Sequence, residues 1–113
     1  KKNKKSENLN KLGCEIIFCK FNKNNKLNLK KIFNVIYSLK ISDILVEAGG
    51  ILFTDLIRNN LVDELHIFKS KIIIGQNGKP AIYGKNLNEL NLFLSDIKKF
   101  KDDKYYCYKV INV

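Results

Sequence analysis

The residues best suited to chemistry in this chain stand in one short stretch, Glu47-Ala48-Gly49-Gly50, directly after the apolar run 44–46. A carboxylate at the end of a buried strand needs polar partners, so Glu47 is a candidate for ligand binding. The two glycines permit a tight turn, and residues 51–57 follow with the apolar spacing of a helix. Free N–H groups and the helix dipole meet at such a helix start, which predicts an anion site suited to a phosphate group. A simple connecting turn is the alternative.

Other candidate residues give weaker signals. His66 is the only histidine and stands between Leu65 and Ile67, with no nucleophile pattern near it. A surface or packing role is therefore favoured over acid–base catalysis. Asp63 and Glu64 are consecutive, and because neighbouring residues of a strand face opposite ways, they are not expected to share one site.

The cysteines indicate neither a disulfide framework nor a metal centre. Cys14, Cys19 and Cys107 are odd in number, form no C-x-x-C pair and lie in strand-like runs. They are expected to be reduced, buried fillers, and with a single histidine we expect no zinc site. A cluster of tyrosines could stack nucleic-acid bases, but packing in a core or a subunit interface is favoured; these are Tyr105, Tyr106 and Tyr108.

The charge of +10 raises the possibility of nucleic-acid binding, but its distribution argues against it. The chain has 20 lysines and one arginine, spread along the sequence apart from the first residues, as in a protein encoded by an AT-rich genome. Arginine forks that recognise guanine are thus nearly absent. No run is long enough for a membrane span and no signal-peptide segment is present, so we expect a cytoplasmic protein that binds neither nucleic acid nor membrane.

The sequence predicts one α/β domain over residues 1–113, in which these residues are carried by strands, helices and turns. Asn28 is placed to cap a helix, and 1–12 is a polar arm or helix tail that ends before Gly13. The predicted strands are 14–21, 44–46, 61–68, 90–100 and 105–111, and the predicted helices are 29–39 and 50–59. Residues 14–46 would form a parallel β-α-β unit with a right-handed crossover, and the last two strands an antiparallel hairpin.

Three motifs in order carry a family resemblance: Ile44-Leu45-Val46-Glu47-Ala48-Gly49-Gly50, Leu61-Val62-Asp63-Glu64-Leu65-His66-Ile67, and the segment from Gly75 through Pro80 to Tyr83-Gly84. Together they resemble the C-terminal reductase domain of the bifunctional bacterial riboflavin-biosynthesis deaminase/reductase. That domain has a dihydrofolate-reductase-like, three-layer αβα fold. The resemblance runs from about Gly13 to the C-terminus.

The resemblance implies NADPH-dependent reduction of 5-amino-6-(5-phosphoribosylamino)uracil to its ribityl form. By the family pattern, Glu47 lies against the substrate. The glycines and the helix start would receive the NADPH phosphates, which maps to Gly49, Gly50, Ile51, Leu52, Phe53, Thr54 and Asp55. No metal is implied, and Asp55 fits least well because a carboxylate repels a pyrophosphate.

Two departures from the family qualify what the resemblance implies. Ala48 replaces the usual glycine, and folds of this kind often have a cis peptide in this turn, which we expect at Ala48–Gly49. The family domain is also longer, and the half that carries most substrate contacts is not in this chain. We therefore expect the C-terminal portion of a longer protein, inactive alone and associating as a homodimer. The alternatives are a related reductase with another substrate and a non-catalytic basic interaction module.

Overall fold

The computed structural model describes residues 3–22, 24–84 and 87–111. The chain forms two compact units, Lys1–Asp43 and Ile44–Val113. Among the residues described, no helix is both long and apolar enough to cross a membrane.

Two helices of the first unit begin at asparagine caps. Helix α1, Lys4–Lys11, has a capping box in which the Asn3 side chain accepts from Ser6 N and the Ser6 hydroxyl accepts from Asn3 N. Helix α2, Leu29–Ser38, is capped by Asn28, whose side chain accepts a hydrogen bond of 3.1 Å from Lys31 N. The predicted helix over 29–39 and its cap are confirmed, and the polar arm is a helix.

The predicted strands 14–21 and 44–46 are not present. Both segments lack regular secondary structure, apart from a single bridge between Phe21 and Leu27. A strand is stabilised by hydrogen bonds to a neighbouring strand, and within the described part of the chain neither segment has one. The parallel β-α-β unit is therefore wrong as a description of this structure. Ile72–Ile74, also apolar, lacks regular structure too, and Ile73 is 92% exposed.

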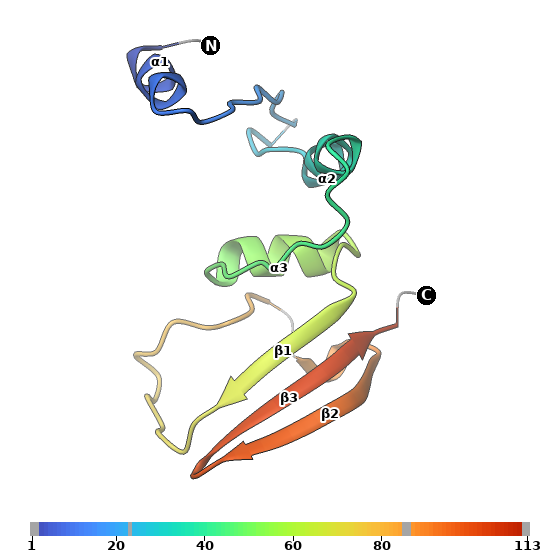
Figure 1. Ribbon diagram of the computed structural model, residues 1–113. Helices are drawn as coiled ribbons and strands as arrows, with labels where there is room; N and C mark the ends of the chain where they lie inside the picture. Colours follow the sequence, from blue (N-terminus) through green and yellow to red (C-terminus); the bar gives the residue numbers. More distant parts are fainter. Residues whose placement is uncertain (1–2, 23, 85–86, 112–113) are drawn as a thin grey trace. The chain divides into compact units, whose positions relative to one another are not determined.

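The second unit contains helix α3, Gly50–Arg58, and a three-stranded sheet (Figure 1). Its strands are β1, Glu64–Lys69, β2, Leu92–Phe100, and β3, Asp103–Val110. Their order is β1-β3-β2 and both pairings are antiparallel, with an irregularity in β2 between Leu94 and Asp96. The α/β class, the helix over 50–59 and the C-terminal hairpin are confirmed. A short 3₁₀ helix, Leu87–Glu89, precedes β2.

The core of the second unit is small. Its buried apolar side chains come from α3, β1 and β3, and are Leu56, Ile57, Leu65 and Cys107. Many large apolar side chains remain exposed, including Phe93 and Ile97 on β2. The sheet therefore presents apolar surface that this chain does not cover in its described residues.

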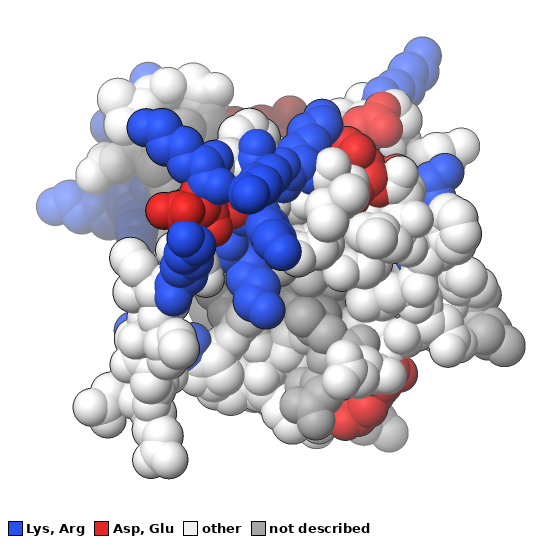
Figure 2. Space-filling model, turned by 90° about the horizontal axis from the view of Figure 1, so that it is seen from below, with Lys and Arg blue, Asp and Glu red and all other residues white. Residues whose placement is uncertain are grey.

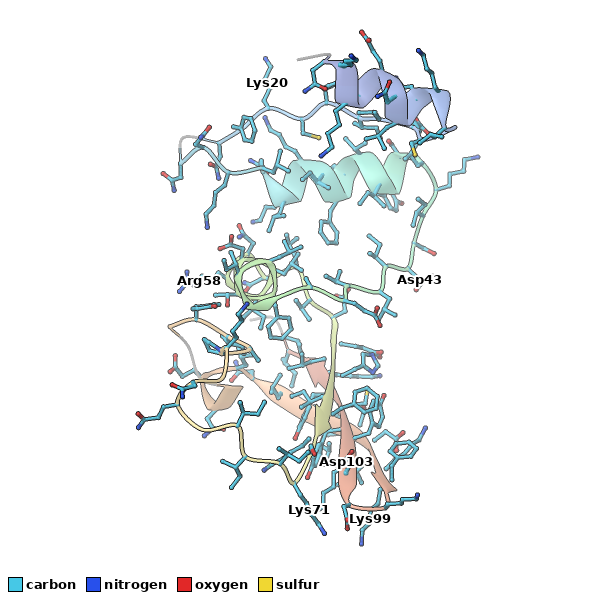
Figure 3. All side chains as sticks on the ribbon, turned by 90° about the vertical axis from the view of Figure 1, so that its left-hand side faces the viewer. Lys20, Asp43, Arg58, Lys71, Lys99 and Asp103 are labelled. Carbon is cyan, nitrogen blue, oxygen red and sulfur yellow. The ribbon has the colours of Figure 1, made fainter. Side chains whose placement is uncertain are left out.

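Basic side chains gather at the hairpin end of the sheet. Lys104 on β3 pairs with Lys69 on one side and Lys99 on the other, so three lysines stand side by side across the strands. Figure 2, seen from below in the view of Figure 1, shows lysines grouped around a few acidic residues, and Figure 3 labels Lys71, Lys99 and Asp103 at this end. Lys71 forms an ion pair with Asp102. Like charges directly opposite one another repel, and nearby carboxylates offset part of that repulsion.

Candidate functional site

The first turn of α3 presents backbone N–H groups that have no acceptor within the helix. Gly49 is the N-cap, with φ −70° and ψ 165°, and no side chain of the described residues caps this helix start. Phe53 N–H is the first to bond within the helix, to Gly49 O at 3.2 Å. The N–H groups of Gly49 to Leu52 therefore have no acceptor within the helix and carry the positive end of its dipole. We call these four residues the helix N-terminal site.

The turn into this site is less strained than the sequence predicts. All peptide bonds between described residues are trans, so the expected cis bond at Ala48–Gly49 is wrong. Gly49 has an extended N-cap conformation that any residue adopts, and the chain enters the helix without an isomerised bond. Neither glycine of the pair has a positive φ.

Gly50 is nevertheless needed for space. A Cβ at this position would lie 2.5 Å from Pro80 O, 2.9 Å from Tyr83 Cε2 and 3.0 Å from Ala81 O. At Gly49, by contrast, a Cβ would meet no atom of the described part of the chain within 4 Å. The loop that carries the third sequence motif thus packs directly on the first turn of α3, and it does so because residue 50 lacks a side chain.

Two side chains of α3 fix this loop. The Thr54 hydroxyl donates to Gly50 O at 2.6 Å and accepts from Tyr83 N at 2.9 Å, with Thr54 only 2% exposed. Arg58, at the end of the helix (Figure 3), donates from Nη2 to Tyr83 O at 3.0 Å. Neither contact could be predicted from the sequence, because the local pattern of α3 does not indicate which distant carbonyl or amide its side chains contact.

The predicted ligand residues fall into three groups. Glu47 is exposed in the irregular segment before the helix, and Gly49, Gly50, Ile51 and Leu52 are brought together at the helix start. Phe53 and Asp55 are half-buried, and Phe53 N–H already has a backbone acceptor. The Thr54 hydroxyl is held by the Tyr83 loop, so its contribution in this structure is to dock that loop.

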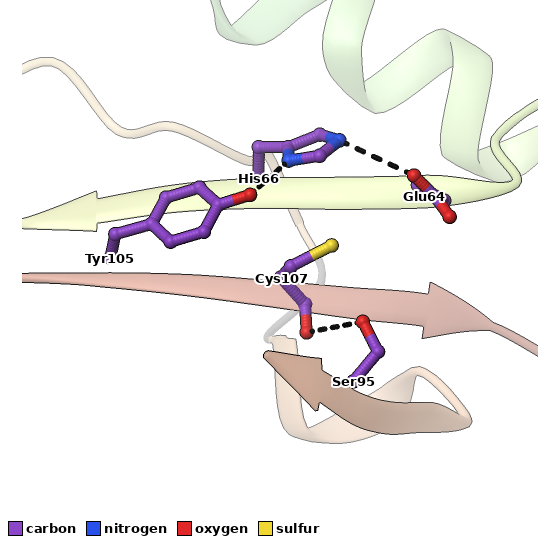
Figure 4. Close-up of polar contacts among 5 residues, drawn as sticks. All are labelled: Glu64, His66, Ser95, Tyr105 and Cys107. Carbon is purple, nitrogen blue, oxygen red and sulfur yellow. Dashed lines mark hydrogen bonds and ion pairs between the residues drawn. The ribbon is translucent and has the colours of Figure 1, made fainter. Parts of the chain in front are cut away.

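A second polar group lies on one face of the sheet (Figure 4). His66 on β1 pairs directly with Cys107 on β3, and Glu64 stands two residues before His66 on the same face. His66 Nδ1 is 2.7 Å from the Tyr105 hydroxyl, and His66 Nε2 is 3.6 Å from Glu64 Oε2. Burial, followed by the hydrogen bond and charge of Cys107, raises the pKa of Tyr105. We call Glu64, His66 and Cys107 the strand cluster.

The cysteines differ from one another. Cys107 is buried in β3 as predicted, whereas Cys14 is exposed and Cys19 half-buried, both outside any strand. All three are free thiols.

Comparison with solved structures defines the fold class. Acinetobacter baumannii RibD, form 2, superposes with a TM-score of 0.78 at 19% identity, covering 93% of this chain and 29% of that one. A pyrimidine reductase-like protein from Corynebacterium diphtheriae gives a TM-score of 0.77 at 21% identity, covering 96% of this chain and 44% of that one. At these identities the likeness concerns the fold alone, and it agrees with the dihydrofolate-reductase-like fold predicted from the motifs.

The sequence match is more specific. The RibD C-terminal domain model matches residues 1–106, and the chain belongs to this family. Riboflavin biosynthesis protein RibD of Buchnera aphidicola subsp. Baizongia pistaciae is 31% identical over 83 residues, which are 74% of this chain and 21% of that protein. The chain thus spans about a fifth of the curated relative it matches. The family predicted from the three motifs is confirmed.

Proposed function

We propose that this chain supplies the NADPH-binding helix of a riboflavin-pathway reductase. The reaction is the reduction of 5-amino-6-(5-phosphoribosylamino)uracil to 5-amino-6-(5-phosphoribitylamino)uracil. Membership of the RibD C-terminal domain family carries the proposal. We also propose that the protein is cytoplasmic and forms a homodimer. The apolar side chains exposed on β2 support association.

The helix N-terminal site fits the cofactor's pyrophosphate. Its backbone donors are consecutive, and the two side chains that follow the glycines, Ile51 and Leu52, are exposed. Within the described residues the space beside Gly49 is open, so a phosphate can approach the backbone there. When bound, NADPH supplies the hydride for the reduction. This chain's part is to hold the pyrophosphate at α3 and to present Glu47, an exposed carboxylate able to accept hydrogen bonds from substrate hydroxyl or amino groups.

Loop docking supports the same assignment. The hydrogen bonds of Thr54 and Arg58 hold the Pro80–Gly84 loop against α3, so the donors are fixed before a ligand arrives. Preorganised donors bind an anion more tightly, because less order has to be created on binding.

The test is a pair of substitutions at Gly49. Gly49→Pro removes one backbone donor, and the ring suits the observed φ of −70°. Gly49→Ala keeps the donor and is its matched control, since a Cβ meets nothing there. NADPH should raise the melting temperature of the wild type and of Gly49→Ala. Gly49→Pro should bind NADPH about tenfold or more weakly, as expected for loss of a hydrogen bond to a charged group.

The two alternative functions give different results. A related reductase with another substrate would show the same NADPH effects and would differ only in which pyrimidine or pterin shifts the melting temperature further. A basic interaction module would show no NADPH effect and would bind nucleic acid with a steep salt dependence. Equal NADPH affinity in Gly49→Pro and Gly49→Ala would remove the helix N-terminal site from the proposal.

A further inference from the structure

The strand cluster brings three different metal-binding groups to one place. Its imidazole nitrogen, carboxylate oxygen and thiol sulfur all lie within 4.8 Å of one another. Cys107 comes from β3 and the other two from β1, and Figure 4 shows the three side chains on the same side of the two strands. The site therefore depends on the strand register, in which His66 stands opposite Cys107.

The spacing is close to that of a metal site. Zinc bonds of about 2.0–2.3 Å at tetrahedral angles place neighbouring ligand atoms roughly 3.3–3.8 Å apart. His66 Nε2 and Glu64 Oε2 are already 3.6 Å apart. Because the Glu64 side chain is 50% exposed, it can rotate toward the buried Cys107 without disturbing a packed core.

Tyr105 orients the imidazole. Its hydroxyl lies 2.7 Å from His66 Nδ1, which leaves Nε2 directed toward Glu64. When the ring carries its proton on Nδ1, this N–H donates a hydrogen bond to the Tyr105 oxygen. The lone pair of Nε2 then faces the cluster. Metal-binding histidines almost always have such a partner on the second nitrogen, because it fixes the ring and its tautomer.

We propose that Glu64, His66 and Cys107 bind a zinc ion that bridges β1 and β3. Mixed nitrogen, oxygen and sulfur donors suit this borderline-soft ion, and a water molecule would complete the tetrahedron. The nearest competing explanation is an ordinary ion pair between protonated His66 and Glu64, which involves neither Cys107 nor a metal. From the sequence alone a zinc site was not expected, because the chain has one histidine and its cysteines lack the spacing of zinc ligands.

The first experiment titrates untagged, chelator-treated protein with Co²⁺ and then with Zn²⁺. An affinity tag would add histidines, and this chain has only one of its own. We expect one equivalent of Co²⁺ to give the near-ultraviolet absorption of a cobalt–thiolate bond and visible bands of a four-coordinate ion. Zn²⁺ should abolish these bands and raise the melting temperature. Absence of a thiolate band, or a stoichiometry far from one, would overturn the proposal.

Substitutions assign the ligands. Cys107→Ser should remove the thiolate band, whereas the double variant Cys14→Ser/Cys19→Ser is the matched thiol control and should keep it. Glu64→Gln changes an exposed side chain, so its fold should be intact, and its Zn²⁺ affinity should fall at least tenfold. Tyr105→Phe should weaken binding by about 10- to 100-fold, as for other partners of ligating histidines.

These variants can contradict the proposal independently of folding. A thiolate band that survives Cys107→Ser, or disappears in the Cys14→Ser/Cys19→Ser control, would place the metal elsewhere. Wild-type Zn²⁺ affinity in the well-folded Glu64→Gln protein would show that Glu64 is not a ligand, which would contradict the three-residue site.

Discussion

The two polar regions of the Ile44–Val113 unit are built in opposite ways. The helix N-terminal site consists of consecutive backbone groups from Gly49 to Leu52, and its donors exist wherever a helix begins without a side-chain cap. The strand cluster consists of side chains from two strands, and it exists only because the register places His66 opposite Cys107. The first depends on local conformation and the second on pairing between distant parts of the chain.

This difference explains why one region was predictable. A glycine pair followed by a helical pattern is visible within one window of sequence, so the anion site could be proposed from residues alone. The sequence contains only part of the strand cluster's pattern: Glu64 and His66 are two residues apart in a predicted strand and therefore share a face. The addition of Cys107 requires the pairing β1-β3, which no local pattern specifies.

The largest expected effect tests how the helix N-terminal site is supported. Gly50→Val places a Cβ against Pro80 O and Ala81 O, so the loop must move or the helix start must shift. We expect a loss of about 1–3 kcal/mol in the free energy of unfolding, measured by urea denaturation. NADPH binding should weaken as well, while the zinc site on the sheet should be unaffected if the two regions are independent.

Gly49→Ala is the control for this substitution, because the neighbouring position has open space. Its urea midpoint should stay close to that of the wild type. Equal midpoints for Gly50→Val and Gly49→Ala would mean that the loop does not pack on the helix as described.

A smaller effect tests the hydrogen bond that docks the loop. Thr54→Val keeps the shape of the side chain but removes the acceptor for Tyr83 N, leaving a partly buried N–H group without its partner. We expect a cost of about 1 kcal/mol in unfolding free energy. Thr54→Ser retains the hydroxyl and should recover most of the loss. If Thr54→Val and Thr54→Ser unfold at the same denaturant concentration, packing rather than the hydroxyl holds the loop.

Local signals also decide which elements the sequence predicts correctly. Asn28 predicts the start of α2, because a cap and the helix it begins are neighbours in sequence. The β2–β3 hairpin was predictable for the same reason, since its strands are joined by the short turn at Lys101-Asp102.

The failed strand predictions have a physical cause in common. Segments 14–21 and 44–46 have the apolar, β-branched composition of buried strands, yet a strand also requires a hydrogen-bonded neighbour. Within the residues that the structure describes, neither segment pairs with a neighbouring strand, and only Phe21 forms a single bridge, to Leu27. The strand predictions for these segments were wrong because composition alone does not show whether a segment has a strand to pair with.

The smallest expected effect tests whether the strand cluster is an ion pair or a metal site. With a chelator present, Glu64→Gln removes only a half-exposed interaction with His66 at 3.6 Å, and such surface pairs contribute about 0–1 kcal/mol. The variant and the wild type should therefore unfold at nearly the same urea concentration. At the same Zn²⁺ concentration, the wild type should become more stable and Glu64→Gln should gain less. Zinc stabilises the folded state that binds it, and the variant binds zinc more weakly. A different result would contradict the metal site. If the wild type is much more stable than Glu64→Gln with a chelator present, and Zn²⁺ does not change this difference, the cluster stabilises the sheet by charge pairing alone. In that case, both polar regions would be complete without a metal, and the contrast between them would be one of sequence distance only.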